Sequence, residues 1–292
     1  MTTFQSTNYP RSAFYSIAGY LLIAIGLVAW KTVLSDYSLA QILFLEAIVC
    51  IPLFVLLSLY KGGIHLLKTH YPLLQLVRGI LQTLSAYIGL YGLIHLPVAT
   101  YTMLGYCSPF LMTLAAHFIL KEKCPVKGWI SIVVGFIGIA LVTQPEYTQN
   151  LTAILCVLLS CVFWAANVIV MRYMPKDDTI CFPFYTLTTA GLISTVILIF
   201  NGFTPMPTND FVPTITAGIF FFFGAQLLFS AYRLAPLFFN TPFQYTQMIW
   251  IGLLSYMMWR EIPTSIQLIG LFLIITATLY SSYLKDENKT AE

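Results

Sequence analysis

The stretch RGILQTLSAYIGLYGLIHLPVATYTMLGYCSPFLMTLAAHFILKE, from Arg78 to Glu122, decides the fold because the chain repeats it. The stretch from Ala217 to Glu261 reads AGIFFFFGAQLLFSAYRLAPLFFNTPFQYTQMIWIGLLSYMMWRE and aligns with it without a gap. Eight positions are identical, and the apolar pattern stays in phase throughout. The second half of the chain is therefore predicted to be a diverged copy of the first. The identical pairs are Gly79 and Gly218, Ile80 and Ile219, Ala86 and Ala225, Pro97 and Pro236, Thr102 and Thr241, Tyr106 and Tyr245, Leu114 and Leu253, and Glu122 and Glu261.

The composition predicts a membrane protein. The chain is 59% hydrophobic and 9% charged, whereas a soluble domain carries about 25% charged residues. A membrane-spanning helix needs roughly 20 apolar residues, so a chain of 292 residues holds about ten such helices with short loops. Ten apolar runs, five in each copy, lie near residues 12–31, 38–60, 72–95, 98–120, 127–144, 151–172, 180–200, 211–232, 236–258 and 264–283.

An odd number of spans in each copy gives the two copies opposite orientations in the membrane. Many secondary transporters are built from such an inverted repeat, and their substrate lies between the repeats near the middle of the bilayer. We therefore predict an all-α polytopic fold of ten transmembrane helices, arranged as two inverted five-helix repeats around a central cavity. The first repeat covers residues 12–144 and the second residues 151–283, followed by a cytoplasmic tail over residues 284–292.

The distribution of basic residues predicts the orientation. With both termini in the cytoplasm, twelve Lys and Arg residues lie in inner loops or at inner helix ends, and only Lys31 and Arg260 lie outside. Such an excess of basic residues is typical of cytoplasmic loops. The net charge of +3 therefore reflects orientation and does not indicate a nucleic-acid partner. The twelve residues are Arg11, Lys61, Lys68, Arg78, Lys121, Lys123, Lys127, Arg172, Lys176, Arg233, Lys285 and Lys289.

Short motifs run through both halves in a specific order. The first half contains Arg78-Gly79, Tyr91-Gly92-Leu93, Pro97-Val98-Ala99, Lys121-Glu122 and Gly135-Phe136-Ile137-Gly138, and the second contains Tyr232-Arg233-Leu234-Ala235-Pro236, Glu261 and Gly270. The chain thereby resembles the EamA family of the drug/metabolite transporter superfamily over nearly its whole length. The resemblance implies a multi-pass carrier of the bacterial inner membrane that works by alternating access. It also implies a small organic substrate, such as an amino acid or a nucleotide-like metabolite.

Glu46 is the only acidic residue well inside any predicted span. Many EamA proteins have a second helix that resembles F-x-x-R-F, so this carboxylate stands where a cation is common. A charge within a span costs at least about 2.5–3.5 kcal/mol and usually faces a cavity or a partner. Glu46 is therefore predicted to bind a cationic group of the substrate or to carry a coupling proton. The structural alternative is an ion pair with Lys31.

Three residues of the third and eighth spans are further candidates for substrate binding. Tyr87 and Tyr91 lie one helical turn apart and share a face. Gln226 aligns with Tyr87 in the second copy, and its amide needs partners in a medium of low dielectric constant. A substrate in the cavity is one such partner, and a neighbouring helix is the other.

Two further pairs complete the predicted site. Tyr106 and Tyr245 occupy equivalent positions in the two copies, near prolines that are predicted to interrupt the fourth and ninth helices. Trp164 and Asn167 lie about one turn apart, so that an indole and an amide share a face suited to a planar ligand. Packing between helices is the structural alternative for both pairs.

Three basic residues near the cytoplasmic ends of spans are assigned other roles. His117 is a candidate for relaying a coupling proton, with a packed neutral imidazole as the alternative. Arg78 and Arg233 are predicted to be structural, because long cationic side chains at helix ends reach toward the lipid headgroups.

The sequence thus predicts a secondary transporter for a small organic metabolite. A carboxylate among aromatic residues favours a cationic or zwitterionic substrate with a planar or apolar part. Within the EamA family, S-adenosylmethionine uptake carriers fit both properties, and amino acid and amine exporters fit almost as well. An exporter of neutral metabolites or drugs remains the alternative within the class.

Other classes of function fit less well. The chain contains no phosphate loop, no HExxH zinc pair and no GxSxG elbow, so we predict no cofactor, no metal and no enzymatic activity. A channel would not explain the inverted repeat. An intramembrane lipid-modifying enzyme would need a convergent ionisable pair, for which Glu46 and His117 are the only candidates. The expected partners are the substrate, the bilayer and a coupling proton or counter-substrate, in a monomer or homodimer.

Overall fold

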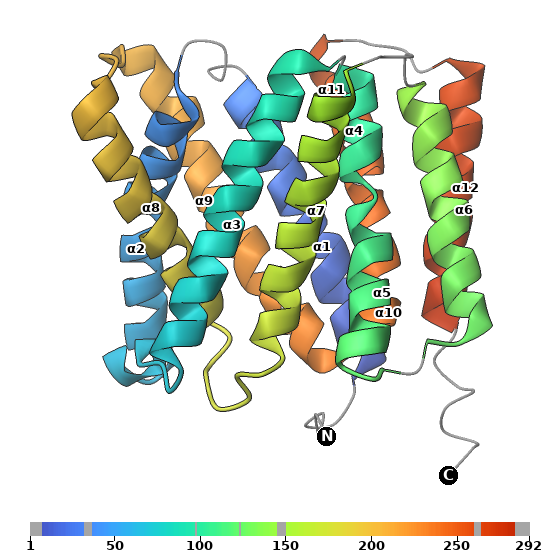
Figure 1. Ribbon diagram of the computed structural model, residues 1–292, viewed down its shortest axis with the longest axis horizontal. Coiled ribbons are helices and arrows are strands. Elements are labelled where there is room, and N and C mark those ends of the chain that lie inside the picture. The colour runs from blue at the N-terminus through green and yellow to red at the C-terminus, as the bar shows by residue number, and fades with distance from the viewer. Residues whose placement is uncertain are drawn as a thin grey trace.

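The computed structural model describes residues 8–31, 37–96, 98–122, 124–144, 150–259 and 264–283. Every regular element within these ranges is a helix, as Figure 1 shows, so the predicted all-α class is confirmed. The long helices are α1 (Tyr9–Lys31), α2 (Leu39–Lys61), α3 (Pro72–His95), α6 (Val126–Thr143), α7 (Leu151–Met171), α8 (Cys181–Asn201), α9 (Thr208–Leu234) and α12 (Ser265–Tyr283). The shorter elements are η1 (Ile64–Leu67), α4 (Val98–Gly105), α5 (Ser108–Ile119), α10 (Leu237–Asn240), η2 (Thr241–Tyr245) and α11 (Thr246–Trp259).

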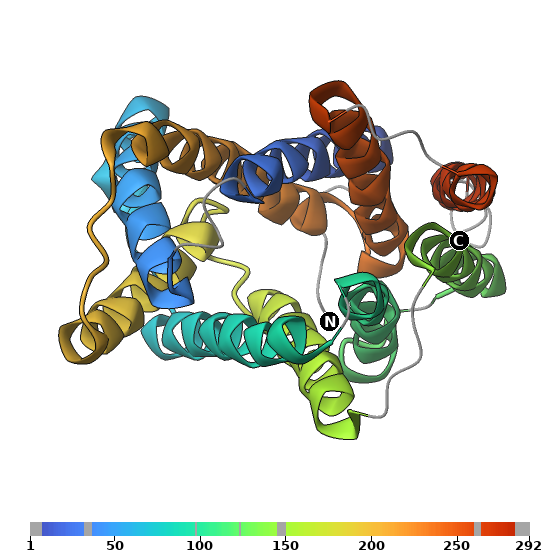
Figure 2. The ribbon, with the colours of Figure 1, turned by 90° about the horizontal axis from the view of Figure 1, so that it is seen from above.

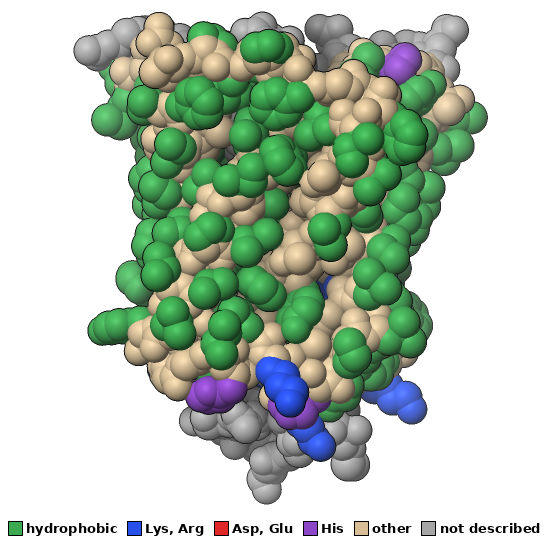
Figure 3. Space-filling model, turned by 90° about the vertical axis from the view of Figure 1, so that its left-hand side faces the viewer, with side chains coloured by type: hydrophobic (Ala, Val, Ile, Leu, Met, Phe, Trp, Pro, Cys, Tyr) green, Lys and Arg blue, Asp and Glu red, His purple; other side chains and the backbone are tan. Residues whose placement is uncertain are grey.

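The helices account for the predicted membrane crossings. Eight segments are long and apolar enough to span a membrane, and they match the first eight predicted spans, with α4 and α5 forming the fourth. The ninth predicted span is divided among α10, η2 and α11, and the tenth is α12. Hydrophobic side chains cover the side of the bundle drawn in Figure 3, whereas Lys and Arg gather at its lower end. This lower end, where α1 begins and α12 ends, is called the terminal end below.

The packing of the helices reproduces the internal repeat. In the first pair of equivalent contacts, α1 packs along α9 and α7 packs along α3. In the second pair, α1 packs against α11 and α7 against α5. The helices α2 and α8 pack against each other at one side of the bundle, and α6 and α12 do so at the opposite side (Figure 2). Each of these contacts joins one copy to the other, which makes the two copies a single body.

The fourth and ninth crossings are interrupted at equivalent places, as predicted. The helix α4 ends at Gly105 and α5 begins at Ser108, whose neighbour Pro109 provides no backbone N–H. In the second copy the 3₁₀ segment η2, which contains Pro242, separates α10 from α11. Gln244 Nε2 donates to Ser108 Oγ at 2.8 Å, so a hydrogen bond joins the two interruptions across the repeat.

Glycines allow α6 and α12 to approach closely. A β-carbon on Gly138 would lie 2.8 Å from the carbonyl oxygen of Gly270 and 2.9 Å from Ile274 Cγ1. A β-carbon on Gly270 would lie 2.6 Å from the carbonyl oxygen of Gly138. Small residues at helix interfaces bring backbones together in this way, which favours van der Waals packing in a lipid environment.

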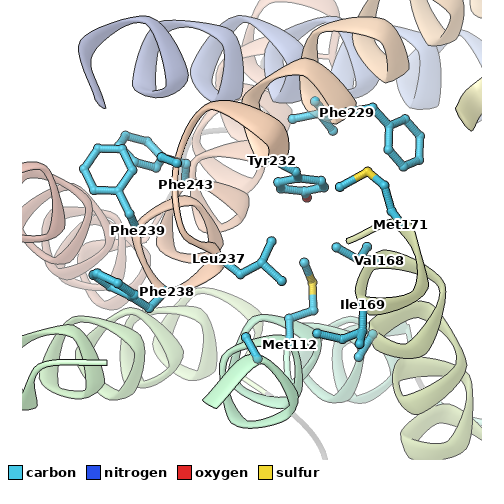
Figure 4. Close-up of a cluster of buried hydrophobic side chains, with 14 of the residues drawn as sticks. Met112, Val168, Ile169, Met171, Phe229, Tyr232, Leu237, Phe238, Phe239 and Phe243 are labelled. Atoms are coloured by element: carbon cyan, nitrogen blue, oxygen red, sulfur yellow. The ribbon is translucent and has the colours of Figure 1, made fainter. Parts of the chain in front are cut away.

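The largest buried hydrophobic cluster closes the terminal end of the bundle. Its 17 members come from α1, α5, α7, α8 and α9, from Met174 in the loop after α7 and from the segment that runs from Ala235 to Phe243 (Figure 4). The other buried clusters contain three to five members each. Within the large cluster the hydroxyl groups of Tyr20 and Tyr232 lie 2.7 Å apart and share a hydrogen bond. Among the described residues, the largest set of buried hydrophobic side chains therefore lies toward the terminal end.

A buried carboxylate anchors the loop between α7 and α8 at this end. The Asp177 side chain is completely buried and accepts hydrogen bonds from Thr69 Oγ1, the His70 backbone N–H (2.7 Å) and Gln75 Nε2 (3.0 Å). Burial by itself raises the pKa of the Asp177 carboxyl, but these hydrogen bonds outweigh it and hold the pKa below its usual value. The loop is thereby fixed to the start of α3.

A second polar contact closes the same end from the other copy. Glu122 Oε2 accepts a hydrogen bond from the Leu237 backbone N–H at 2.9 Å, and Arg172 Nη2 donates to the Ala235 carbonyl at 2.8 Å. Arg172 Nη2 also lies 3.7 Å from Glu122 Oε1. Burial lowers the pKa of Arg172 to about 10. The predicted equivalent of Glu122 in the second copy, Glu261, lies outside the described residues.

The substitution Gly138→Ala should lower the free energy of unfolding by about 1–3 kcal/mol, because backbone atoms of α12 cannot move aside without separating the helices. Gly252→Ala is the matched control, since no described atom lies within 4 Å of the position of its β-carbon. The control should be neutral or stabilising. Thermal unfolding of both variants in one detergent checks this, and equal midpoints would contradict the close contact.

The substitution Asp177→Asn should destabilise the protein at neutral pH by about 1–3 kcal/mol, because an amide group would face a hydrogen-bond donor. A carboxyl with a lowered folded pKa stabilises above its unfolded pKa of about 3.9 and loses this contribution as the pH falls further. The stability difference between wild type and variant should therefore shrink below about pH 4. Unfolding midpoints across pH 3–7 test this, with the exposed Asp178→Asn as control; a difference independent of pH would refute it.

Candidate functional site

Glu46 lies on the part of α2 that faces the neighbouring helices. One residue along, Ala47 packs against Gly191 of α8, and one turn along, Cys50 Sγ donates to the Gly218 carbonyl of α9 at 3.1 Å. Ile48, on the other face of α2, is 50% exposed. The half-buried Glu46 carboxylate makes no hydrogen bond or ion pair with any residue that the structure describes. The side chain of Lys31, its predicted structural partner, is outside the described part.

The tyrosines of α3 occupy different surroundings. Tyr87 is partly buried, and its hydroxyl oxygen lies 3.5 Å from Ser194 Oγ of α8, which places the phenol between the two helices. Tyr91 is 40% exposed and stacks on His95, with ring centroids 4.1 Å apart. The two rings therefore share a helical face, as predicted, but Tyr91 lies one turn nearer the end of α3 that is remote from the terminal end.

Asn167 and Gln226 are both buried and both incompletely hydrogen-bonded. Asn167 Nδ2 donates to Gln82 Oε1 at 2.9 Å, and Gln226 Nε2 donates to Thr179 Oγ1 at 3.1 Å. The two amide oxygens, Asn167 Oδ1 and Gln226 Oε1, have no donor in the structure. Each side chain thus presents an unused acceptor inside the bundle.

The symmetry-related tyrosines meet each other in a separate cluster. The ring centroids of Tyr106 and Tyr245 lie 6.1 Å apart, and both rings pack with Ile139 of α6 and Ile274 of α12. Tyr245 is completely buried, and its hydroxyl donates to the Ile132 carbonyl at 3.2 Å. The pair therefore lies near the axis that relates the two copies. The Tyr245 hydroxyl is already used in a hydrogen bond within the protein.

The remaining candidates are not brought into one site. Trp164 is half-buried and packs against the large cluster at the terminal end. His117 is exposed on α5; its Nδ1 lies 3.1 Å from the Glu122 carbonyl, and its ring borders Phe118 and Trp129. Because α2 packs against α8 and α9 while α5 packs against α7, the structure does not unite Glu46 with His117.

Arg78 departs from its predicted place. Its side chain is fully buried instead of extending toward the headgroups, so that prediction is wrong. Arg78 Nε donates to the Asn167 carbonyl (3.2 Å), and Nη1 donates to Gln75 Oε1 (2.9 Å) and to the Phe182 carbonyl (3.4 Å). The guanidinium carbon lies 4.8 Å from the centroid of the Phe182 ring and 5.1 Å from that of Phe229. Contacts to α7, α8 and α9 hold the side chain inside the bundle.

Arg233 is also drawn inward, to a place beside the same ring. Its guanidinium carbon lies 4.9 Å from the centroid of the Phe182 ring. Its Nη1 donates to the Asp177 carbonyl at 2.8 Å, and its Nη2 donates to the Met174 carbonyl. Unlike Arg78, this side chain uses both terminal nitrogens to bind the loop between α7 and α8. Its role is therefore structural, as predicted, although its partners are loop carbonyls.

The structure thus gathers polar groups between α2, α3, α7, α8 and α9. Four buried atoms there, one from each of α3, α7, α8 and α9, have no hydrogen-bond partner among the described residues: Arg78 Nη2, Asn167 Oδ1, Thr186 Oγ1 and Gln226 Oε1. A cationic donor and neutral acceptors in a water-poor interior can bind a small polar solute. Across the described residues, no three His, Cys, Asp or Glu side chains come together in a way that could hold a metal ion.

The sequence contains one signal that points to Arg78. Counted from Pro72, the first residue of α3, Arg78 lies six residues into the helix, or about 9 Å at 1.5 Å per residue. The equivalent residue of the second copy is Ala217, so the charge is not required by the repeated fold. Gln75 and Gln82, which contact Arg78 and Asn167, give no comparable signal because single glutamines are common at helix ends and interfaces.

Comparisons with known proteins agree with this architecture. The model of the EamA-like transporter family matches residues 11–144 and again residues 151–283. A solved crystal structure superposes with a TM-score of 0.83 at 14% identity, covering 94% of this chain and 96% of the other, which shows a shared fold.

Three relatives of named function are similar over most of their length. The S-adenosylmethionine uptake transporter of Rickettsia prowazekii is 25% identical over 85% of this chain and 83% of its own. The pseudopaline exporter of Pseudomonas aeruginosa is 25% identical over 84% of this chain and 87% of its own. The riboflavin transporter of Rhizobium johnstonii is 25% identical over 78% of this chain and 76% of its own. Because the family model covers both halves, this chain belongs to the EamA-like transporter family and is a multi-pass membrane transporter of metabolites, not an enzyme.

Proposed function

We propose that the protein carries a small organic metabolite with a cationic or zwitterionic group, and with a planar or apolar part, across the bacterial inner membrane. The observation that carries this proposal is Glu46, a carboxylate on the inner face of an apolar helix with no partner among the described residues. Because an unpaired carboxylate within a span is costly, a cationic solute that neutralises it binds there favourably. Tyr87, which lies between α3 and α8, provides aromatic surface for the rest of the solute.

The names of the relatives support an organic solute of this kind. S-adenosylmethionine, named for the Rickettsia relative, combines a sulfonium cation, a purine ring and an amino-acid head. Riboflavin, named for another relative, is planar and neutral, so the alternative of a neutral metabolite rests on that similarity. One relative is named for uptake and another for export, and the direction of transport is therefore left out of the proposal.

The arrangement of the core supports alternating access. The large hydrophobic cluster and the loop contacts of Asp177 and Glu122 close the terminal end. We assign this end to the cytoplasm, with both chain termini there, because most Lys and Arg residues lie in the loops on that side. In this conformation the solute would reach Glu46 from the opposite side of the membrane, and opening of the cluster would release it to the cytoplasm.

A proton is the second candidate for the partner of Glu46. A carboxylate that alternately faces the two sides of a membrane can bind a proton on one side and lose it on the other. Solute and proton would then compete for the same oxygen atoms. The exposed His117 lies on another part of the bundle, so this coupling role rests on Glu46 alone.

The substitution Glu46→Gln should abolish binding of a cationic solute while leaving the fold intact. The test is thermal stabilisation of the purified protein by a panel of amino acids, amines, nucleosides and S-adenosylmethionine. A solute at 100 times its dissociation constant should add about 2.7 kcal/mol to the stability of the wild type. The variant should show no stabilisation by the same solute, because the neutral amide cannot compensate a cation.

The matched control is Asp178→Asn, which removes an exposed carboxylate at the terminal end and should bind like the wild type. Stabilisation by a neutral or anionic solute, unchanged in Glu46→Gln, would exclude the cationic substrate. Failure of Glu46→Gln to fold, with normal folding of the control, would favour the structural pair with Lys31.

A further inference from the structure

We propose that Arg78 binds a carboxylate of the transported solute, which makes the substrate an amino-acid-like zwitterion and not a simple cation. This inference rests on the proposed function, and it adds a second charged group at a different depth in the bundle. It is carried by the hydrogen-bond inventory of the Arg78 guanidinium, the charges around it and the unused acceptors on the adjoining helices.

One of the three nitrogens of the Arg78 guanidinium has no hydrogen-bond acceptor among the described residues. Its Nε and Nη1 donate to the Asn167 and Phe182 carbonyls and to Gln75 Oε1, whereas the buried Nη2 has no acceptor. A buried donor without a partner costs about 1–3 kcal/mol, and more when it belongs to a charged group. An arginine that only held helices together would have been expected to use both terminal nitrogens, as Arg233 does.

The surroundings hold this unused nitrogen in a fixed direction. Gln75 is completely buried; its Oε1 accepts from Arg78 Nη1 while its Nε2 donates to Asp177 Oδ2 at 3.0 Å. The glutamine thus connects the guanidinium to a buried carboxylate without letting the two form an ion pair. The rings of Phe182 and Phe229 border the guanidinium, and a donor fixed by such neighbours is preorganised for a planar anion.

Arg78 is a buried cation without a carboxylate partner. Arg78 and Arg233 lie at similar distances, 4.8 and 4.9 Å, from the centroid of the Phe182 ring. Asp177 is the only fully buried carboxylate among the described residues near them, and neither arginine forms an ion pair with a described carboxylate. Arg233 is only partly buried, and the exposed Asp178 belongs to the loop that it binds, whereas Arg78 is fully buried. A carboxylate of the solute would therefore supply the anion that Arg78 lacks.

Acceptors near Arg78 match an ammonium group. Asn167, whose carbonyl binds Arg78 Nε, also presents the unused Oδ1. Gln226, which presents the unused Oε1, lies one turn before Phe229 on α9, and the Phe229 ring borders the guanidinium. One donor with positive charge and two neutral acceptors are the complement of a carboxylate beside an ammonium. The ligand class is therefore an amino-acid head group.

The depth of Arg78 relative to Glu46 also fits an extended zwitterion. Arg78 lies six residues from the start of α3, and Glu46 lies fifteen residues from the end of α2, both counted from the terminal end. At 1.5 Å per residue the two positions differ by about 13 Å along the bundle. This distance joins backbone positions, so a zwitterion with its head at Arg78 reaches Glu46 only with both side chains extended toward it. Because the Arg78 side chain is completely buried in this conformation, its binding step requires the residues that cover it to move.

The test compares solutes that differ only in their carboxylate. The pairs are S-adenosylmethionine with its decarboxylated form, arginine with agmatine, and lysine with cadaverine, measured by thermal stabilisation and by competition for uptake into proteoliposomes. Wild type should prefer the carboxylate-bearing member by about ten- to hundredfold, as expected for a charge-assisted hydrogen bond at a buried site. In Arg78→Gln the preference should fall to about onefold, with unchanged affinity for the amine. Arg78→Lys should retain part of it, and the exposed Arg11→Gln should retain all of it.

The outcomes separate this inference from the proposed function. A wild type that binds both members of each pair equally overturns the role of Arg78, and it does so even if Arg78→Gln fails to fold. A carboxylate preference that persists in Arg78→Gln has the same consequence. If Arg78→Gln loses the carboxylate preference while Glu46→Gln binds the solutes like the wild type, the result supports carboxylate binding by Arg78. The same result refutes the cation site at Glu46. A wild type that binds no member of any pair overturns both proposals.

Discussion

The hydrocarbon interior of a bilayer provides no hydrogen-bond partner, and the rest of the structure depends on this constraint. Helices satisfy their own backbone groups, which explains why every regular element among the described residues is helical. The two interrupted crossings are the exceptions, and their polar groups meet inside the bundle. Gln244 donates to Ser108 across the repeat, and the hydroxyls of Thr113 and Thr241 lie 2.8 Å apart. Irregular backbone is tolerated here because protein, and not lipid, surrounds it.

The same constraint gives meaning to the groups that remain unsatisfied. Arg233, which is partly buried, shows that the fold can provide carbonyl partners for both terminal nitrogens of a guanidinium. Arg78 lies beside the same aromatic ring, yet one of its nitrogens has no acceptor. Since helix ends and loop carbonyls are close at hand, a structural role alone does not explain the difference. A carboxylate of the solute bound to Arg78, as proposed above, would explain the difference, and an ammonium group beside it would explain why the unused atoms of Asn167 and Gln226 are acceptors.

The sequence predicted the elements that depend on local composition, and it failed where tertiary packing decides. The crossings followed from the lengths of apolar runs, and the breaks at Pro109 and Pro242 followed from the missing N–H of proline. The repeat identified Tyr106 and Tyr245 as equivalent residues, and the structure brings their rings together. The burial of Arg78 did not follow, because a cationic side chain near a helix end was expected to extend toward the headgroups, whereas the faces of α7, α8 and α9 packed over it decide its burial. The hydrophobic pattern of one helix does not show which side chains the neighbouring helices pack against it.

The remaining question is why a symmetric fold has an asymmetric interior. The packing of α1 on α9 and of α7 on α3 preserves the relation between the copies, so both faces of the membrane can be opened by equivalent motions. The polar side chains inside the bundle do not follow this symmetry, because Arg78 corresponds to Ala217 and Tyr87 corresponds to Gln226. Alternating access requires equivalence of the helices that move, but a solute with one charged head has no symmetry of its own. Under the proposed binding mode, differences between equivalent interior side chains let a symmetric scaffold bind an asymmetric molecule in one orientation, and the unmatched Arg78 is the residue that best marks that orientation.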